Sequence, residues 1–293
     1  MKLEVFSDLS ERLNYNLPDF PLYARKGSLR HFDRYAAAYH WHPDVEFILI
    51  LDGSMEYFVN GQTVTLSKGE GIFVNSKRLH YGFSAAQTDC TFLVIVIHPS
   101  LLGEGTLAGK AYFEQKFGSA TEHFLLLQPE VPWQQKVLDS IKQLYEHMHD
   151  DSDNLFRRMS QAANLCALVS DHLQSAPEQG NDEHAWMLIR AMTRHIHQNY
   201  EEKLTIDEIA GAGSVCRSTC CSLFKKHLGQ TPNNYLIQYR IQKSCEMLKE
   251  TERSIGEIAL ASGFQTSSYF SMVFRKHMGF SPQHFRQTVE AVK

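Results

Sequence analysis

The sequence predicts an α+β protein of two domains, an N-terminal β-barrel followed by an all-α domain that contains two helix-turn-helix units. Short apolar runs separated by turn residues fill the first third of the chain, and a helical period replaces them from about residue 132. The last third contains one pattern twice. At 293 residues, the chain is long enough for each domain to bury its own core.

The barrel is expected over residues 1–100, with its core at about 30–98. Turn residues such as Asn60-Gly61 separate the apolar runs, and Asn-Gly in that position is a strong indication of a hairpin. Many short strands with no helical period between them are typical of a small antiparallel barrel or sandwich. The predicted strands cover residues 46–51, 55–59, 63–66, 71–74 and 91–97.

Two helices are expected behind the barrel, in a helical extension over 101–174. Val137, Ile141 and Leu144 recur at helical spacing, and a similar stripe follows in the next helix. The two helices could complete the core of the barrel or present their stripe to a second subunit, and we expect them to form a homodimer interface. The polar stretch over 175–184 is expected to be a linker.

The charge of the chain differs between its two parts. Residues 1–180 hold 15 Lys and Arg against 22 Asp and Glu, whereas residues 181–293 hold 14 against 11. A net positive C-terminal part, within a chain of net charge −4, favours a nucleic-acid partner for that part.

Neither a membrane segment nor a secretion signal is expected. No apolar run approaches the roughly 18–20 residues that cross a bilayer, and the N-terminus has early acidic residues. We therefore expect a cytoplasmic protein with six reduced cysteines and no membrane partner. Cys216 and Cys220 have the spacing of two ligands on one helix face, next to Cys221, so a thiol metal or redox site and a packing role both stay open.

An internal repeat of about 50 residues occupies the expected domain at 185–290. The stretch "LTIDEIA" at 204–210 aligns with "RSIGEIA" at 253–259, and "LFKKHLGQTP" at 223–232 aligns with "VFRKHMGFSP" at 273–282. Each copy has a Thr or Ser followed three residues later by Glu, which is the capping box of a helix start. Two copies of one helical unit are therefore predicted.

Each copy is predicted to form a helix, a glycine-bearing turn and a second helix, at about 204–227 and 254–277. This is the helix-turn-helix arrangement, whose second helix enters the major groove of DNA. Arg and Gln can bind purines bidentately, Ser and Thr reach bases or phosphates, and basic side chains at the far helix ends suit the backbone. Any one of these side chains could instead be an ordinary solvated residue. The candidate DNA-binding residues are Arg217, Ser218, Thr219, Ser222, Lys225, Lys226, Gln265, Thr266, Ser267, Ser268, Ser271, Arg275 and Lys276.

Several stretches of the repeat are specific to one family. They are "SIGEIALASGF" at 254–264, "SSYFSMVFRKHMGFSP" at 267–282, Tyr239-Arg240-Ile241, Met247-Leu248 and Phe285-Arg286. In these stretches the chain resembles the DNA-binding domain of the AraC/XylS family of bacterial transcription regulators. The resemblance implies a long helix, about 232–249, that joins two helix-turn-helix units facing successive major grooves. The first unit departs from the family at Cys216, where serine is usual, so the second unit is expected to carry the sequence-specific contacts.

Two motifs in the barrel region contain residues that can bind a metal. His40, His42 and Glu46, followed by Gly53, have the spacing of the first cupin motif, and His80 stands in a degraded copy of the second. The N-terminal segment therefore resembles a cupin. We expect His40, His42 and Glu46 to share one face of a strand, because alternate residues of a strand point to the same side.

The resemblance implies two uses for these residues. With His80 they could bind a divalent metal, since imidazoles and carboxylates suit iron, nickel, manganese or zinc. Without a metal, which is not expected to be required, they could hydrogen-bond a polar ligand such as a sugar. The candidate pocket residues are His40, His42, Glu46, His80, Trp41 and Tyr39.

The sequence thus predicts a DNA-binding transcription factor that responds to a small-molecule effector. The resemblance implies an activator that recruits RNA polymerase and regulates a small-molecule, for instance carbohydrate, utilisation operon. Two alternatives stay open. One is a metal-dependent cupin enzyme, for which a DNA-binding tail has no use, and the other is a constitutive DNA-binding protein whose barrel senses nothing.

Overall fold

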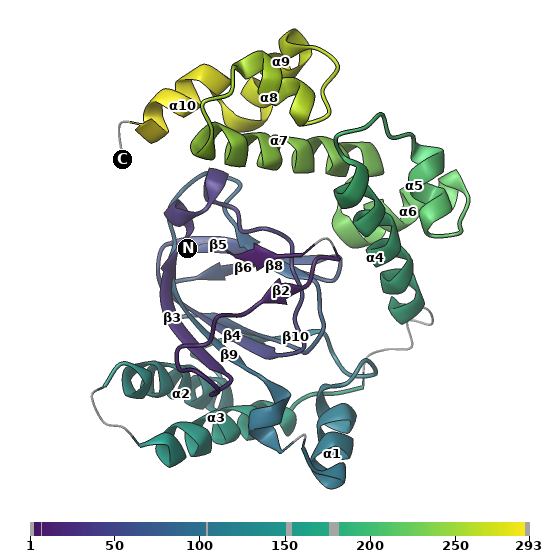
Figure 1. Ribbon diagram of the computed structural model, residues 1–293. Helices are drawn as coiled ribbons and strands as arrows, with labels where there is room; N and C mark the ends of the chain where they lie inside the picture. The colour runs from purple at the N-terminus through teal and green to yellow at the C-terminus, as the bar shows by residue number, and fades with distance from the viewer. Residues whose placement is uncertain (1–2, 7, 104, 151–153, 176–181, 291–293) are drawn as a thin grey trace. The chain divides into compact units, whose positions relative to one another are not determined.

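The computed structural model describes residues 3–6, 8–103, 105–150, 154–175 and 182–290 (Figure 1). The chain divides into two compact units, Met1–Asn181 and Asp182–Lys293. Most of the predicted linker at 175–184 lies outside the described residues. No helix in the described part of the chain is long and apolar enough to cross a membrane.

Two antiparallel sheets form the N-terminal unit, which is the predicted mixed α+β architecture (Figure 1). One sheet has five strands in the order β10-β7-β4-β9-β3, and the other has three in the order β6-β5-β8. A short pair, β1 (Glu4–Val5) and β2 (Glu11–Arg12), precedes them. The strands of the two sheets are β3 (Leu22–Ser28), β4 (Val45–Asp52), β5 (Ser54–Val59), β6 (Gln62–Ser67), β7 (Gly71–Val74), β8 (His80–Phe83), β9 (Thr91–Ile97) and β10 (Phe124–Leu127).

The central strands β4 and β9 are buried on both faces, which explains their uninterrupted apolar runs. Phe47 and Ile95 belong to the core beneath the five-stranded sheet, whereas Ile48 and Val94 belong to the core between the two sheets. Successive side chains of a strand point to opposite faces, so each strand supplies both cores. The space between the sheets is where the functional side chains gather.

Helices cover the outer face of the five-stranded sheet. They are α1 (Leu107–Phe117), α2 (Pro132–Met148) and α3 (Leu155–Ser170), and Figure 1 shows α2 and α3 beside β4 and β9. The predicted stripe of Val137, Ile141 and Leu144 is fully buried in this core. The stripe therefore completes the core of its own chain and is not available to a second subunit.

Five strands were not predicted from the sequence, namely β1, β2, β3, β8 and β10, and two of them belong to the five-stranded sheet. β10 interrupts the region expected to be helical, because its four residues gain hydrogen bonds from the edge strand β7. β3 starts at residue 22, before the expected core, and pairs with β9 along its whole length. Its sequence, LYARKGS, lacks an apolar alternation, so only the pairing makes it a strand.

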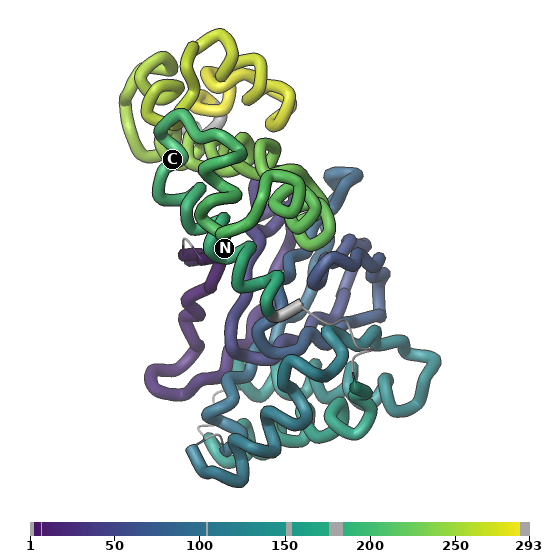
Figure 2. Tube along the Cα trace, turned by 90° about the vertical axis from the view of Figure 1, so that its right-hand side faces the viewer, coloured from purple at the N-terminus to yellow at the C-terminus, as the bar shows by residue number. Residues whose placement is uncertain are grey.

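The C-terminal unit is helical, as predicted, and its two halves are built alike (Figures 1 and 2). The long helix α7 packs against α5 and α6 of the first half and against α8 and α9 of the second. Both predicted capping boxes form, at Thr205 with Glu208 and at Ser254 with Glu257. The helices are α4 (Asp182–Asn199), α5 (Ile206–Ala212), α6 (Arg217–Leu228), α7 (Pro232–Glu250), α8 (Ile255–Ala261), α9 (Ser267–Met278) and α10 (Pro282–Glu290).

Candidate functional site

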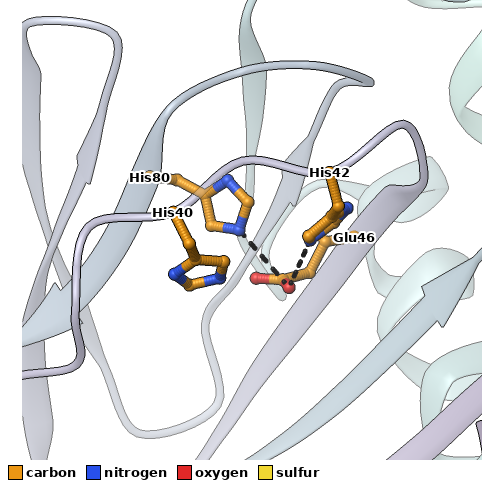
Figure 3. A group of neighbouring side chains, drawn as sticks. All are labelled: His40, His42, Glu46 and His80. Atoms are coloured by element: carbon orange, nitrogen blue, oxygen red, sulfur yellow. Dashed lines mark hydrogen bonds and ion pairs between the residues drawn. The ribbon is translucent and has the colours of Figure 1, made fainter. Parts of the chain in front are cut away.

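Four side chains that can bind a metal converge between the two sheets (Figure 3). They are His40, His42, Glu46 and His80, all buried, and one nitrogen or oxygen of each lies within 4.8 Å of the others. Glu46 Oε2 lies 3.4 Å from His42 Nε2 and 3.5 Å from His80 Nε2. The four residues of the two motifs thus form one cluster.

The two histidines of the first motif reach this cluster by a route that the sequence did not predict. His40 and His42 lie in the segment before β4, and His40 forms an isolated bridge with His80. The expectation that they share a strand with Glu46 is wrong, because Pro43 has no N–H to donate and β4 begins only at Val45.

Backbone carbonyls orient two of the imidazoles. His40 Nδ1–H donates to Ala38 O and His80 Nδ1–H donates to Arg78 O, both over 2.8 Å. Each ring is thereby held with its Nε2 lone pair toward the cluster. His42 turns Nε2 toward Glu46, while its Nδ1 lies 3.6 Å from Asp44 Oδ2.

The charge state of the cluster follows from its burial and from its close pairs. Burial lowers the pKa of His40 to about 3, so this imidazole is neutral. Burial alone would raise the pKa of Glu46, but the neighbouring histidines and their hydrogen bonds bring it well below its usual value. Tyr57 Oη also donates to Glu46 Oε1. A neutral imidazole and an ionised carboxylate are the forms that bind metals.

A cavity of about 150 Å³ opens beside the cluster, between the two sheets. His40, Glu46, Glu11 and Tyr57 provide polar atoms in its wall. The remaining wall is mixed: Arg12, Asn14, Tyr23 and Arg25 add polar groups, and the apolar part includes Leu13, Leu29, Phe32, Ile48, Met55 and Phe92. The cavity therefore suits a small ligand with both polar and apolar parts.

Two of the predicted pocket residues do not line this cavity. Tyr39 packs against Phe58 and Tyr81, with ring centroids 5.9 and 4.0 Å apart. Trp41 Nε1 donates to Asp8 O over 2.9 Å, which fixes the N-terminal segment. His42 and His80 also lie outside the wall, behind the other two members of the cluster.

Glu11 and Tyr57 are site residues that the sequence reasoning missed. Glu11 Oε2 lies 3.4 Å from His40 Nε2, and burial raises the pKa of this carboxyl group to about 7. Arg25 of β3 is a third cavity residue that was not predicted. No motif contains these residues, and they reach the cavity from three separate strands, β2, β3 and β5, so only the tertiary structure could identify them.

The predicted DNA-binding residues lie on or just before α6 and α9. All of them are exposed except Ser271, which is half-buried, while Phe224, Val273 and Phe274 face the core. The side chains on or beside α6 are Arg217, Ser218, Thr219, Ser222, Lys225 and Lys226, and those on or beside α9 are Gln265, Thr266, Ser267, Ser268, Ser271, Arg275 and Lys276.

The starts of these two helices differ. Thr266 caps α9, because its hydroxyl oxygen accepts a hydrogen bond from Tyr269 N over 3.2 Å. Cys216 holds the matching position of α6 and makes no such cap. Hydrogen bonds from Ser218 and Thr219 lower the pKa of the exposed Cys216 thiol to about 6.

The exposed face of α9 carries two large side chains that the sequence reasoning passed over. Tyr269 is 47% exposed and Met272 is 62% exposed. The matching positions of α6 are Thr219 and Ser222, so the two helices present different chemistry at equivalent places. An apolar side chain here can contact a thymine methyl group.

The cysteines in the described residues are free thiols. Cys220 is buried and Cys221 half-buried, whereas Cys216 is exposed. No metal-ligating cluster in the described part of the chain includes them. Of the two roles left open by the sequence, packing therefore accounts for the buried Cys220.

The geometry defines a class of protein, a regulator that joins a ligand-binding β domain to paired helix-turn-helix units. Residues 25–169 match the AraC-like ligand binding domain, and residues 209–288 match a helix-turn-helix domain. The chain belongs to the AraC/XylS family of transcription regulators.

Three bacterial regulators are similar to this chain along most of its length. It is 29% identical over 250 residues to the uncharacterised regulator YdeC of Bacillus subtilis, covering 85% of each chain. It is 25% identical to the melibiose operon regulatory protein of Escherichia coli, covering 85% of this chain and 83% of that one. It is 26% identical to the transcriptional activator RhaS of an Enterobacter species, covering 86% and 88%.

Proposed function

We propose that the chain is a ligand-responsive transcription factor in which a small effector binds the cavity of the N-terminal domain and changes the affinity of α6 and α9 for DNA. The observation that carries this proposal is the cavity with His40 and Glu46 in its wall, inside the domain that matches a ligand-binding family. The coupling is allosteric if effector and operator change each other's affinity.

The effector that fits the cavity is small and has both polar and apolar parts. A cavity of about 150 Å³ holds a molecule of roughly the size of benzene. Its wall offers a sugar several hydrogen-bonding partners, among them Glu11, Arg25 and Glu46, beside its apolar side chains. The small volume therefore limits the size of the carbohydrate expected from the sequence, and named for the melibiose relative, more than the chemistry of the wall does.

DNA recognition is assigned to the exposed faces of the two second helices. Gln265 and Arg217 can bind purines bidentately, and Lys276 can bind phosphate. Replacing Gln265 or Arg217 by Ala should relax base preference at one position and cost about 1–3 kcal/mol on the preferred operator. Lys276→Ala should weaken binding to all DNA sequences alike. It should also reduce the slope of the logarithm of the DNA-binding constant against the logarithm of the salt concentration by about one.

Binding of the full-length protein to randomised operators, followed by sequencing, tests this assignment. Lys68→Ala, a change of an exposed lysine in the N-terminal domain, is the matched control and should leave DNA binding as it is. Unaltered base preference in both the Gln265→Ala and Arg217→Ala variants would show that these helices are not the sequence readers.

Activation through RNA polymerase is proposed as the regulatory outcome, because the RhaS relative is an activator. The test is transcription in vitro from the identified promoter with purified polymerase, with and without effector. Transcript levels that fall when the protein is added would make it a repressor. Promoter occupancy unaffected by any effector would favour the constitutive DNA-binding protein instead.

A homodimer is proposed, and the side chains that support it lie at the start of α3. Leu155, Phe156 and Met159 are exposed there, with Phe156 at 83%. These residues differ from the α2 stripe that the sequence pointed to, which is buried in its own chain. Sedimentation of wild-type and Phe156→Glu protein tests the interface, and equal dimer dissociation constants would contradict it.

A metal-dependent enzyme is the second candidate, and the cluster of three histidines and Glu46 is the observation that favours it. The relatives are transcription regulators, which speaks against it. Turnover of a small substrate by the metal-loaded protein, lost in His42→Ala, would establish the enzyme.

A further inference from the structure

We propose that Met272 of α9, with Tyr269 beside it, recognises the methyl group of a thymine in the major groove of the operator. This contact rests on the proposed function, which makes α9 a DNA-reading helix. The proposed function leaves open which base the middle of α9 selects, and Met272 selects thymine.

Met272 lies at the centre of the face that α9 turns away from its core. Phe270 and Phe274 are buried on the opposite face. Residues four apart are neighbours on a helix surface, so Met272 lies one turn after Ser268 and one turn before Lys276. Met272 is thus placed between the helix start, which contacts base edges in a helix-turn-helix unit, and a basic side chain suited to phosphate.

The charge of α9 indicates DNA as the partner of this face. Arg275 and Lys276 are exposed, and the 12 residues of the helix include no Asp or Glu. An apolar side chain within a basic face fits a partner that is negatively charged and apolar at one point. A base pair with thymine is such a partner, because the phosphates carry the charge and the thymine methyl group is the apolar group in the major groove.

The two large side chains of α9 form one apolar pair on its surface. Met272 is 62% exposed and Tyr269 is 47% exposed, three residues before it. The Tyr269 ring packs against Phe264, with ring centroids 6.1 Å apart, so this ring has a fixed support. The unbranched Met272 side chain has three rotatable bonds and can adjust to the position of a methyl group.

The first helix-turn-helix unit lacks this pair. Thr219 and Ser222 of α6 stand at the positions that match Tyr269 and Met272. The Ser222 hydroxyl donates and accepts hydrogen bonds and offers no methyl group for an apolar contact. The thymine preference is therefore expected in the half-site of α9 and not in that of α6, so the two half-sites of the operator should differ.

Replacing thymine by uracil in the operator tests the contact, because uracil lacks only the methyl group and pairs with adenine in the same way. The operator is the one that the full-length protein selects from randomised DNA. Each thymine of the α9 half-site is replaced in turn. One replacement should weaken binding of the wild type about fourfold, the effect expected for burying about one methyl or methylene group.

Variants of Met272 assign that effect to one side chain. Met272→Ala should lose the distinction between thymine and uracil at that position, as should Met272→Gln. Met272→Leu keeps an apolar side chain of similar volume and should retain the distinction. Met187→Ala is the matched control, because Met187 is a methionine of α4 that is 55% exposed, and it should bind both operators like the wild type. Circular dichroism shows that each compared variant is folded.

Three results would overturn the contact. They are a selected operator without thymine in the α9 half-site, equal binding of the wild type to thymine and uracil operators, and a thymine preference that persists in Met272→Ala. A Met272→Ala variant that binds like the wild type but activates transcription less would also overturn it, and would assign Met272 to a protein partner.

The same samples separate this contact from the proposed function. Altered base preference in Gln265→Ala or Arg217→Ala, together with no effect of uracil, leaves the proposed function standing and removes only the thymine contact. Unaltered base preference in both of those variants overturns the assignment of α6 and α9 as sequence readers, and the thymine contact with it.

Discussion

At the residue scale, the two halves of the DNA-binding domain differ at the residue before each second helix. Thr266 caps α9 through a side-chain hydrogen bond, whereas Cys216 makes none to the start of α6. Serine and threonine oxygens satisfy a free N–H of the first turn, and sulfur does so poorly. The first unit therefore begins with a weaker helix start than the second.

Cys216→Ser is expected to raise the free energy of unfolding of the C-terminal unit by about 1 kcal/mol, because the hydroxyl supplies the missing cap. The matched change Thr266→Ala removes the cap of α9 and should lower it by a similar amount. Urea unfolding followed by circular dichroism measures both. Equal stability of Cys216→Ser and wild type would mean that the cysteine already acts as a cap.

The predicted pocket residues differ in how well the sequence alone could place them. The cluster of His40, His42, Glu46 and His80 could be predicted, because its side-chain types and spacing match a motif. The side-chain directions of Tyr39 and Trp41 could not be predicted. Tyr39 packs against Tyr81 and Trp41 donates to Asp8 O, and both partners are more than 30 residues away in the sequence.

At the scale of elements, the turn between α8 and α9 depends on one glycine. Gly263 has φ of +79°, which L-residues with a side chain rarely adopt. A Cβ at this position would lie 2.1 Å from Tyr200 O and 2.8 Å from Arg240 Nε. The turn thus combines a left-handed backbone with close packing against α7 and the end of α4.

Gly263→Ala is expected to destabilise the C-terminal unit by about 2 kcal/mol or more, since backbone strain and the contact with Tyr200 O act together. Gly256→Ala is the control, because it lies within α8 with open space around it. It should stabilise the unit by about 0.5–1 kcal/mol. Thermal unfolding measures both, and a destabilised Gly256→Ala would mean that the loss at Gly263 is not specific to the turn.

At the scale of the whole molecule, the chain has two units with separate cores. The cores of the N-terminal unit lie between its sheets and beneath the helices α2 and α3, and that of the second helix-turn-helix unit gathers around Phe270 and Phe274. Units with their own cores can unfold independently. This organisation suits a protein that binds two different partners.

Calorimetry of the full-length protein is therefore expected to show two unfolding transitions. Operator DNA should raise the midpoint of the C-terminal transition, because it binds only the folded form. Gly263→Ala should lower the midpoint temperature of the C-terminal transition and leave that of the N-terminal transition unchanged. A single transition, shifted as a whole by Gly263→Ala, would show that the two units unfold together.

The sequence by itself determined the fold class and the class of the protein. Apolar strands, capping boxes and the internal repeat are local patterns, so they persist whatever the tertiary contacts are, and they place α5, α6, α8 and α9 correctly. The motif residues of the cluster were determined in the same way. What only the tertiary structure decided is contact between distant segments: the strand β10, the role of the α2 stripe and the presence of Glu11 beside His40. Each of these three features depends on a contact with a segment that is distant in the sequence, and no local pattern of residues specifies which segments come into contact.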